Sequence, residues 1–280
     1  MTQMSDRWDE YADSYAEWSS RQTLPYAKHA LDLVNIGERA KILDVATGDG
    51  AFALEAAARH PTSSIVAIDY SSAMIDILDE RIKERGLGAI ISTKVGDAQA
   101  LDFPNDSFDC VAVVFGLFLM TDGLQCLQEI HRVLKPGGTL VFTSWGQTFV
   151  SDLVFGALLA IDPEAAMKRV LFKCTNVAKP GTWNNHDWIR EKCLNAGFGS
   201  PEIHVVSHPT QVHVNEKDSF AKMLGGGPGI RFLMRAEGWT EENSKRVEEG
   251  LAVALNGLFD SGVENVYLVS SANVVICKNE

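Results

Sequence analysis

Apolar and polar positions follow two different rhythms along the first half of the chain. Short continuous apolar runs predict buried strands, and between them apolar residues recur every three or four positions, as on one face of a helix. Strands are expected at 41–45, 64–69, 91–95, 110–115 and 139–145, and helices at 51–59, 72–85 and 124–134. Strands that alternate with helices predict an α/β fold.

The second half of the chain is less regular. A helix at 187–196, strands at 202–214 and 266–277, and an amphipathic helix at 241–259 are expected there. The complete prediction is a Rossmann-like, seven-stranded, mostly parallel sheet with helices on both faces and an inserted helical cap. Its expected divisions are an N-terminal helical lid at 1–40, a core at 41–146, a helical cap insertion at 147–186, and completion of the core at 187–280 with a second helical insertion around 215–262.

Aromatic residues recur at helical spacing near the N-terminus. Trp8, Tyr11, Ala12, Tyr15 and Trp18 would share one face of a helix, and a second helix is expected at 24–36. This aromatic face either packs on the core or closes over a ligand, and the two roles are compatible.

The most informative stretch is the turn after the first predicted strand. Gly48 and Gly50 let the backbone pass close to a ligand, and the helix that follows has free N–H groups at its start. Asp44 precedes the turn, and an acid there would repel a pyrophosphate but suit an ammonium group. The turn therefore favours a nucleoside that carries an amino acid, although a generic turn is the structural alternative.

A second acid strengthens this interpretation. Asp69 ends the next predicted strand about 20 residues after Gly48, where a βαβ unit grips a ribose diol. The alternative role is an N-cap for the helix at 72–85, which is common for Asp.

Composition narrows the class of partner. The 280 residues are 46% hydrophobic and 22% charged, as in ordinary globular proteins, and the formal charge of −12 disfavours nucleic acid. No apolar run approaches the roughly 20 residues that span a bilayer, and the acidic first 20 residues do not resemble a secretory signal. We therefore expect a cytoplasmic protein without stable membrane association. Five scattered cysteines predict neither a disulfide framework nor a metal site.

Four stretches together carry a resemblance to a known family. Residues 42–50, 66–74, 96–111 and 129–145 resemble class I S-adenosylmethionine-dependent methyltransferases, in the small-molecule branch that includes the ubiquinone/menaquinone C-methyltransferases. The stretches 43–50 and 132–138 are the most specific. Ala46 stands where the usual first glycine would be, a variant which that branch tolerates.

The resemblance implies roles for individual residues around S-adenosylmethionine. Asp44 would steer the amino group, often through water, and Asp69 would bind the ribose hydroxyls. Tyr70 and Met74 would flank the adenine, while Asp97 would accept from its exocyclic amine. The residues expected to contact the cofactor are Tyr15, Asp44, Ala46, Thr47, Gly48, Gly50, Asp69, Tyr70, Met74, Asp97, Ala98 and Phe115.

The methyl acceptor is defined less sharply by the sequence. Aromatic faces attract a sulfonium, and Tyr15, Phe118 and Trp145 are candidate walls of that pocket. Contacts with the acceptor are expected from Tyr11, Phe118 and Trp145. No spacing selects a base among the histidines, so no catalytic residue is predicted.

The two helical insertions could enclose an apolar acceptor pocket. The sequence therefore predicts methyl transfer from S-adenosylmethionine to a small, fairly apolar metabolite at O, S, N or C, of the natural-product type. The alternatives are a quinone-precursor C-methyltransferase and a cyclase-type or binding protein that keeps the cofactor without methylating.

Overall fold

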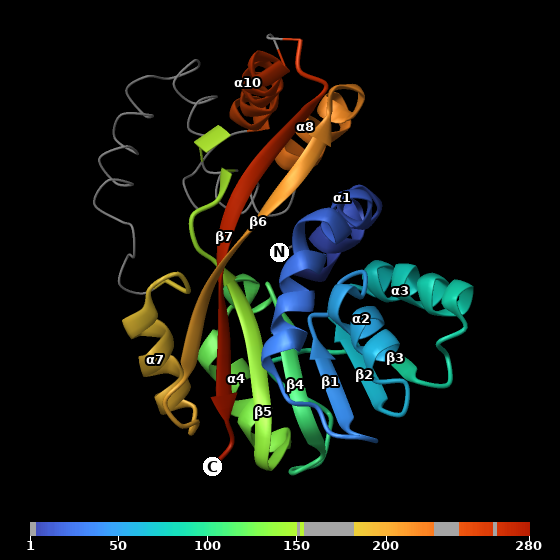
Figure 1. Cartoon of the computed structure of the whole chain (residues 1–280), viewed down its shortest axis with the longest axis vertical. Coiled ribbons are helices and arrows are strands. Elements are labelled where there is room, and N and C mark those ends of the chain that lie inside the picture. The colour runs from blue at the N-terminus through green and yellow to red at the C-terminus, as the bar shows by residue number, and fades with distance from the viewer. Residues whose placement is uncertain (1–3, 150–151, 154–181, 227–240, 260–261) are drawn as a thin grey trace.

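A computed structural model describes residues 4–149, 152–153, 182–226, 241–259 and 262–280. They contain a seven-stranded sheet in the order β3-β2-β1-β4-β5-β7-β6 (Figure 1). The strands are β1 (Lys41–Val45), β2 (Ser64–Asp69), β3 (Ile91–Val95), β4 (Phe108–Val114), β5 (Leu134–Trp145), β6 (Glu202–His213) and β7 (Asn265–Lys278). Strands β1 to β5 pair in parallel, and β7 pairs antiparallel with both β5 and β6. The predicted fold class is confirmed.

Helices cover both faces of this sheet. The helices that the structure describes are α1 (Met4–Leu33), α2 (Ala51–Arg59), α3 (Ser72–Arg85), α4 (Gly123–Val133), α7 (His186–Asn195), α8 (Lys217–Gly226) and α10 (Glu241–Phe259), with short 3-10 turns η1 (Leu117–Leu119) and η2 (Val214–Glu216). One core cluster joins α4 and α7 to the sheet, and a second joins the C-terminal half of α1, α2 and α3 to the other face. The central strands β1 and β4 are short, apolar and largely buried, as expected inside a parallel sheet.

Local signals in the sequence set the ends of the helices. Ser71 caps α3 by accepting the Met74 N–H at 3.2 Å, and Gly86 ends the helix in the left-handed conformation. Asp122 and Asn185 cap α4 and α7 in the same way. Gly50 precedes α2 with φ 90° and offers no side-chain oxygen. The first turn of α2 therefore depends on other residues for its hydrogen bonds.

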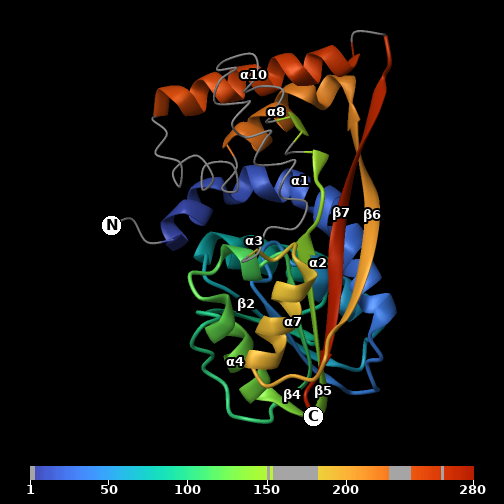
Figure 2. The same ribbon diagram turned by 90° about the vertical axis from the view of Figure 1, so that its left-hand side faces the viewer.

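The N-terminal segment corrects one prediction. The sequence suggests a second helix that starts at residue 24, but α1 runs unbroken through Pro25. A proline inside a helix removes one backbone hydrogen bond. Packing compensates, because Tyr26, Ala27 and Ala30 beyond the proline are buried against the body of the protein. Figure 2 shows the N-terminal half of α1 between the core and the helices α8 and α10.

Strands β6 and β7 form a long antiparallel arm. β7 lies inside the sheet between β5 and β6, so the sixth strand along the chain occupies the edge. The distal half of the arm carries α8 and α10, which pack on it through a separate cluster that includes Trp18, Phe220 and Leu255. The distal part of β6 and β7, together with α8 and α10, is called the cap side below, and its apolar cluster with Trp18 of α1 is called the cap core (Figure 2).

The predicted helical cap and the predicted domain division both remain predictions. Most of the predicted helical cap insertion at 147–186 lies outside the described residues, and the proposed division into lid, core and insertions stays a prediction. Among the described helices, none combines the length and apolar character needed to cross a bilayer.

Candidate cofactor site

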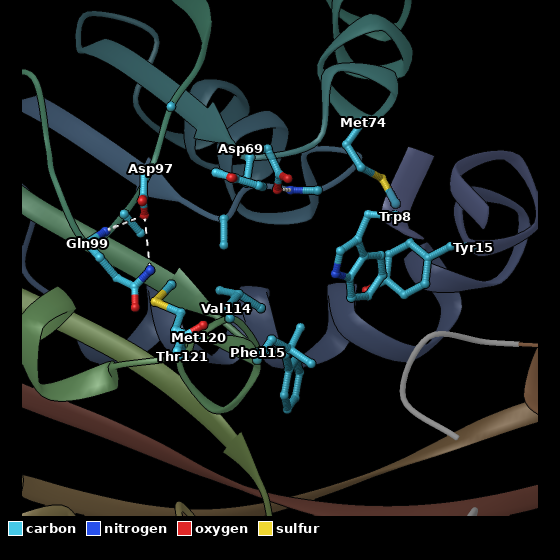
Figure 3. Close-up of a pocket in the computed structure, with 17 residues that line it drawn as sticks. Trp8, Tyr15, Asp69, Met74, Asp97, Gln99, Val114, Phe115, Met120 and Thr121 are labelled. Atoms are coloured by element: carbon cyan, nitrogen blue, oxygen red, sulfur yellow. Dashed lines mark hydrogen bonds between the residues drawn. The ribbon is translucent and has the colours of Figure 1, made fainter. Parts of the chain in front are cut away.

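A pocket opens at the C-terminal ends of β1 to β4 (Figure 3). It contains about 950 Å³ of space that atoms do not fill, part of which is open to solvent. Its lining residues are Trp8, Tyr15, Ala46, Gly48, Asp69, Tyr70, Met74, Gly96, Asp97, Ala98, Gln99, Val114, Phe115, Gly116, Leu119, Met120 and Thr121. Ligands of open α/β sheets bind at this edge, outside the carboxyl ends of the strands.

The glycine turn after β1 forms part of the pocket wall. Ala46 and Gly48 have φ values of 53° and 55°, in the left-handed region, and the Gly48 N–H donates to Asp69 Oδ2 at 2.8 Å. A β-carbon at Gly48 would lie 3.9 Å from the ring of Tyr15. The backbone and this ring therefore approach each other closely, and the turn is pinned to the tip of the neighbouring strand.

Asp69 lies where the sequence places it, at the end of β2 and in the pocket wall. Its carboxylate accepts the N–H groups of Gly48 and, at 3.0 Å, of Ser71. Burial raises the pKa of Asp69, and the hydrogen bonds from the backbone oppose that shift. The capping of α3 falls to Ser71 instead, so Asp69 shapes the loop and can face a ligand; its binding of a ribose stays a prediction.

Asp97 and Ala98 line the pocket just after the end of β3. Asp97 Oδ1 accepts the backbone N–H of Gln99 at 2.8 Å and its side-chain amide at 3.3 Å, so the carboxylate is oriented (Figure 3). Gln99 in turn accepts the Asp122 N–H at 2.7 Å. The orientation of Asp97 is thus coupled to the start of α4, a connection that the sequence does not reveal.

Asp44 is placed differently from a pocket-lining acid. Its side chain is 1% exposed and is absent from the wall. Oδ2 accepts the Thr47 hydroxyl at 2.6 Å and the Ala53 N–H at 3.1 Å, which supplies the first turn of α2 with an acceptor. Burial, with Asp69 and Asp49 as smaller contributions, raises the pKa of Asp44 to about 7. Asp44 organises the turn, and its role toward a ligand amino group stays a prediction.

The aromatic residues of α1 form one side of the pocket. The rings of Trp8 and Tyr15 meet edge to face with centroids 5.4 Å apart (Figure 3). Asp9 accepts hydrogen bonds from the Ser71 hydroxyl and, at 3.1 Å, from the Ala73 N–H, which holds the start of α1 on α3. Arg81 donates to the Ala16 carbonyl at 3.1 Å and pairs with Asp49 beside the glycine turn. This segment covers one side of the pocket, and its role as a lid stays a prediction.

Phe115 forms the floor on the side of β4. It has φ 57°, its N–H donates to the hydroxyl of Thr143 at 2.9 Å, and its ring stacks on Trp145 at 3.8 Å with an interplanar angle of 16°. Phe115 lies in the pocket wall, whereas Phe118 and Trp145 pack behind it in the same aromatic group. Thr143, which fixes this backbone, gave no signal in the sequence because hydroxyls are common in strands.

The structure brings most of the predicted cofactor residues together. Tyr15, Ala46, Gly48, Asp69, Tyr70, Met74, Asp97, Ala98 and Phe115 all line the pocket, while Thr47 and Gly50 belong to the turn beneath it. The side chain of Tyr11 lies outside the described residues. Sequence reasoning missed several lining residues, namely Trp8, Gly96, Gln99, Val114, Gly116, Leu119, Met120 and Thr121. Only Trp8, through the aromatic periodicity of α1, gave a signal that could have found it.

The charged side chains that line the pocket favour some classes of ligand over others. Among the described residues of the wall, two are acidic, Asp69 and Asp97, and none is basic. Such a wall attracts a cation and repels a pyrophosphate. Within the described part of the chain, no group of three His, Cys, Asp or Glu side chains is arranged to hold a metal ion.

Comparisons with known proteins agree with this geometry. Residues 42–138 match the model of a methyltransferase domain family. The C-methyltransferase UbiE of Geotalea daltonii, from ubiquinone/menaquinone biosynthesis, is 38% identical over 117 residues, covering 41% of this chain and 50% of that enzyme. The demethylmenaquinone methyltransferase of Geobacillus kaustophilus is 35% identical over 124 residues, covering 44% and 53%.

Solved structures share the fold at lower identity. A phosphoethanolamine N-methyltransferase 2 of Haemonchus contortus, solved with phosphomonomethylethanolamine and S-adenosylhomocysteine, superposes with a TM-score of 0.58 and 16% identity, covering the whole of this chain and 61% of that one. The [4+2]-cyclase SpnF superposes with a TM-score of 0.53 and 19% identity, covering 91% and 80%.

The fold, the pocket and these matches support a methyltransferase domain at residues 42–138 that resembles the class I S-adenosylmethionine-dependent enzymes. The domain resembles those of the UbiE-type enzymes, and S-adenosylmethionine is its cofactor. The chain spans about half the length of the curated relatives it matches.

Proposed function

We propose that this protein transfers the methyl group of S-adenosylmethionine to a small, fairly apolar metabolite. The acid-lined, aromatic-walled pocket at the tips of β1 to β4 carries this proposal. Asp69 and Asp97 suit the ribose and the adenine of the cofactor, and a wall without basic side chains among its described residues suits a sulfonium. Aromatic faces such as those of Trp8 and Tyr15 add cation–π attraction worth ~0.5–2 kcal/mol.

The bound cofactor supplies a methyl group that the positive sulfur activates for in-line displacement. The residues of the chain then need only to align the acceptor and to exclude water. Trp8 and Tyr15 cover one side of the pocket, and Phe115 is held rigidly on the other side by Thr143 and Trp145. A rigid floor and an aromatic cover are what such an alignment requires.

The apolar character of the acceptor is inferred from the far end of the pocket. Val114, Phe115, Leu119 and Met120 line it, and the aromatic group of Tyr26, Phe118 and Trp145 lies behind them. An acceptor of the quinone-precursor type is the alternative, supported by the UbiE-type relatives. These relatives match 41–44% of this chain, which leaves the acceptor to be tested.

The test combines binding with turnover. Calorimetry with S-adenosylhomocysteine should show binding, and S-adenosylhomocysteine should form when S-adenosylmethionine is supplied with neutral thiol, phenol or amine acceptors on an apolar ring. Phosphoethanolamine, which is anionic, serves as the negative control. Turnover with demethylmenaquinone alone would favour the quinone alternative. Tight cofactor binding without methyl loss to any acceptor would overturn the proposal in favour of a non-methylating protein.

A further inference from the structure

The two aromatic residues that α1 contributes to the pocket wall each have a neighbour that is bonded to α3. Trp8 and Tyr15 line the pocket. Asp9, which directly follows Trp8, accepts the Ser71 hydroxyl and, at 3.1 Å, the Ala73 N–H. Both donors lie at the start of α3, where backbone N–H groups lack partners within the helix and a carboxylate is favoured. Asp9 therefore holds the start of α1 against the start of α3.

A second connection joins the same two helices further along. Ala16 directly follows Tyr15, and its carbonyl oxygen accepts a hydrogen bond of 3.1 Å from Arg81 Nη2. Arg81 Nη1 donates to the carbonyl oxygen of Asp49 at 3.0 Å and pairs with the carboxylate of the same residue. Asp49 lies between the two glycines of the turn after β1, and its side chain is 3% exposed. Arg81 thus links α1, α3 and the glycine turn at one point.

The spacing of the two connections is similar on both helices. Ala16 comes seven positions after Asp9, and Arg81 comes eight positions after Ala73, which is about 10 and 12 Å along an α-helix. The two helices therefore lie side by side along one edge of the pocket. Met74 of α3 lies beside the aromatic rings of α1 in the pocket wall (Figure 3).

These connections act on the pocket from outside its wall. The described residues of the wall include Trp8 and Tyr15 but neither Asp9 nor Arg81. One connection lies at each end of the segment 8–16, which carries both rings. Separation of this segment from α3 would widen the pocket on this side, and it would have to break both connections.

We propose that Asp9 and Arg81 are positioning residues that hold α1 closed over the pocket and thereby set the rate at which S-adenosylmethionine and S-adenosylhomocysteine enter and leave. They act through Trp8 and Tyr15, whose backbone they fix on α3. Their bonds shift an equilibrium between a closed and an open position of α1 toward the closed one. Cofactor exchange does not depend on which acceptor is methylated, so this role is separate from the proposed function.

The experiment measures both rate constants of S-adenosylhomocysteine binding to the full chain by stopped-flow tryptophan fluorescence. Asp9→Ala removes the first connection, and Arg81→Met removes the second but keeps an apolar stem. Each variant should raise the dissociation rate constant about five- to tenfold, as expected for the loss of one or two hydrogen bonds. The association rate constant should rise by a similar factor, because the open form that admits the ligand is more populated, so the Kd should change less than about threefold.

Two further variants separate the hydrogen bonds from charge and from general stability. Asp9→Asn keeps a side-chain oxygen that can accept the same two hydrogen bonds, so both rate constants should stay within about twofold of wild type. Arg59→Met is the matched control. Arg59 has a side chain 31% exposed, against 24% for Arg81, and it also links α1 to another helix, through Asp32 in the C-terminal half of α1. Arg59→Met should leave both rate constants unchanged.

Three results would overturn the proposal. The first is an unchanged dissociation rate constant in a folded Asp9→Ala protein. The second is faster dissociation without faster association, which would show that the bonds only shape the binding surface. The third is an effect of Asp9→Asn or Arg59→Met as large as that of Asp9→Ala. Because Arg81 also holds the glycine turn, Asp9→Ala decides the question if Arg81→Met does not fold or gives a different result. Methyl transfer to the panel of acceptors is measured separately, and its failure defeats only the proposed function.

Discussion

The cofactor side and the cap side of this molecule are built in opposite ways. Around the pocket, backbone conformation and hydrogen bonds to the backbone determine the structure. The Gly48 N–H donates to Asp69, and Asp44 accepts the Thr47 hydroxyl in the turn that follows it. On the cap side, Trp18, Phe220 and Leu255 come from segments far apart in the chain and meet through apolar packing. The structure of the cofactor side is therefore determined by short stretches of sequence, whereas that of the cap side depends on contacts between distant segments.

The largest effect is expected at Asp69, on the cofactor side. Asp69→Ala removes the acceptor for Gly48 and Ser71 and the predicted ribose ligand, so the affinity for S-adenosylhomocysteine should fall about 100-fold, since charge-assisted hydrogen bonds are the strong ones. Isothermal calorimetry measures this loss, and Asp102→Ala, on the exposed surface, is the control. Unchanged affinity in a folded Asp69→Ala protein would remove Asp69 from the cofactor site.

Gly116→Ala tests the close packing of the pocket floor. An added β-carbon would lie 2.8 Å from the β-carbon of Ala46 and 2.9 Å from Val113 Cγ1, so the two loops would have to separate. The free energy of unfolding should drop by about 1–3 kcal/mol, as for other overpacked sites. Gly88→Ala is the matched control, because a β-carbon there meets nothing within 4 Å. Equal urea midpoints for the two variants would contradict the observed contact.

The pH dependence of stability probes Asp44. Because burial raises its pKa in the folded protein to about 7, above the ~3.9 of an unfolded Asp, its protonated form favours folding, and this contribution is lost as the pH rises from about 4 to 7. The stability of the wild type relative to Asp44→Asn should therefore decline as the pH rises through that window. Urea unfolding at several pH values measures it. A parallel pH profile for both proteins would refute the assignment.

The smallest effect is expected at the ion pair between α1 and η2. Arg21 donates to both carboxylate oxygens of Glu216 at 2.9 and 2.8 Å, and the pair is exposed. Arg21→Ala should cost about 0.5–1 kcal/mol of unfolding free energy, less at high salt. A loss of several kcal/mol in thermal or urea unfolding would show that charge, and not the apolar cluster around Trp18, holds the cap side together.

The sequence predicted the cofactor side well for physical reasons. The helices at 51–59 and 72–85 have clear apolar periodicity, and Ser71 and Gly86 mark the ends of the second one. The turn that contains Gly48 is specified within a few residues. The prediction of a separate helix from residue 24 was wrong, because tertiary packing keeps α1 continuous across Pro25. The place of β7 inside the sheet could not be predicted, since strand order depends on contacts between distant segments. The same limit hid the packing of Trp18 on Phe220.

The single helix α1 has a consequence for any opening of the pocket. It carries Tyr15 at the cofactor and Trp18 in the cap core on adjacent turns, and it continues without a break to the sheet. A continuous helix moves as one body, so Tyr15 and Trp18 move together. Any displacement of α1 that uncovered the pocket at Tyr15 would therefore also disturb the packing of Trp18 on Phe220.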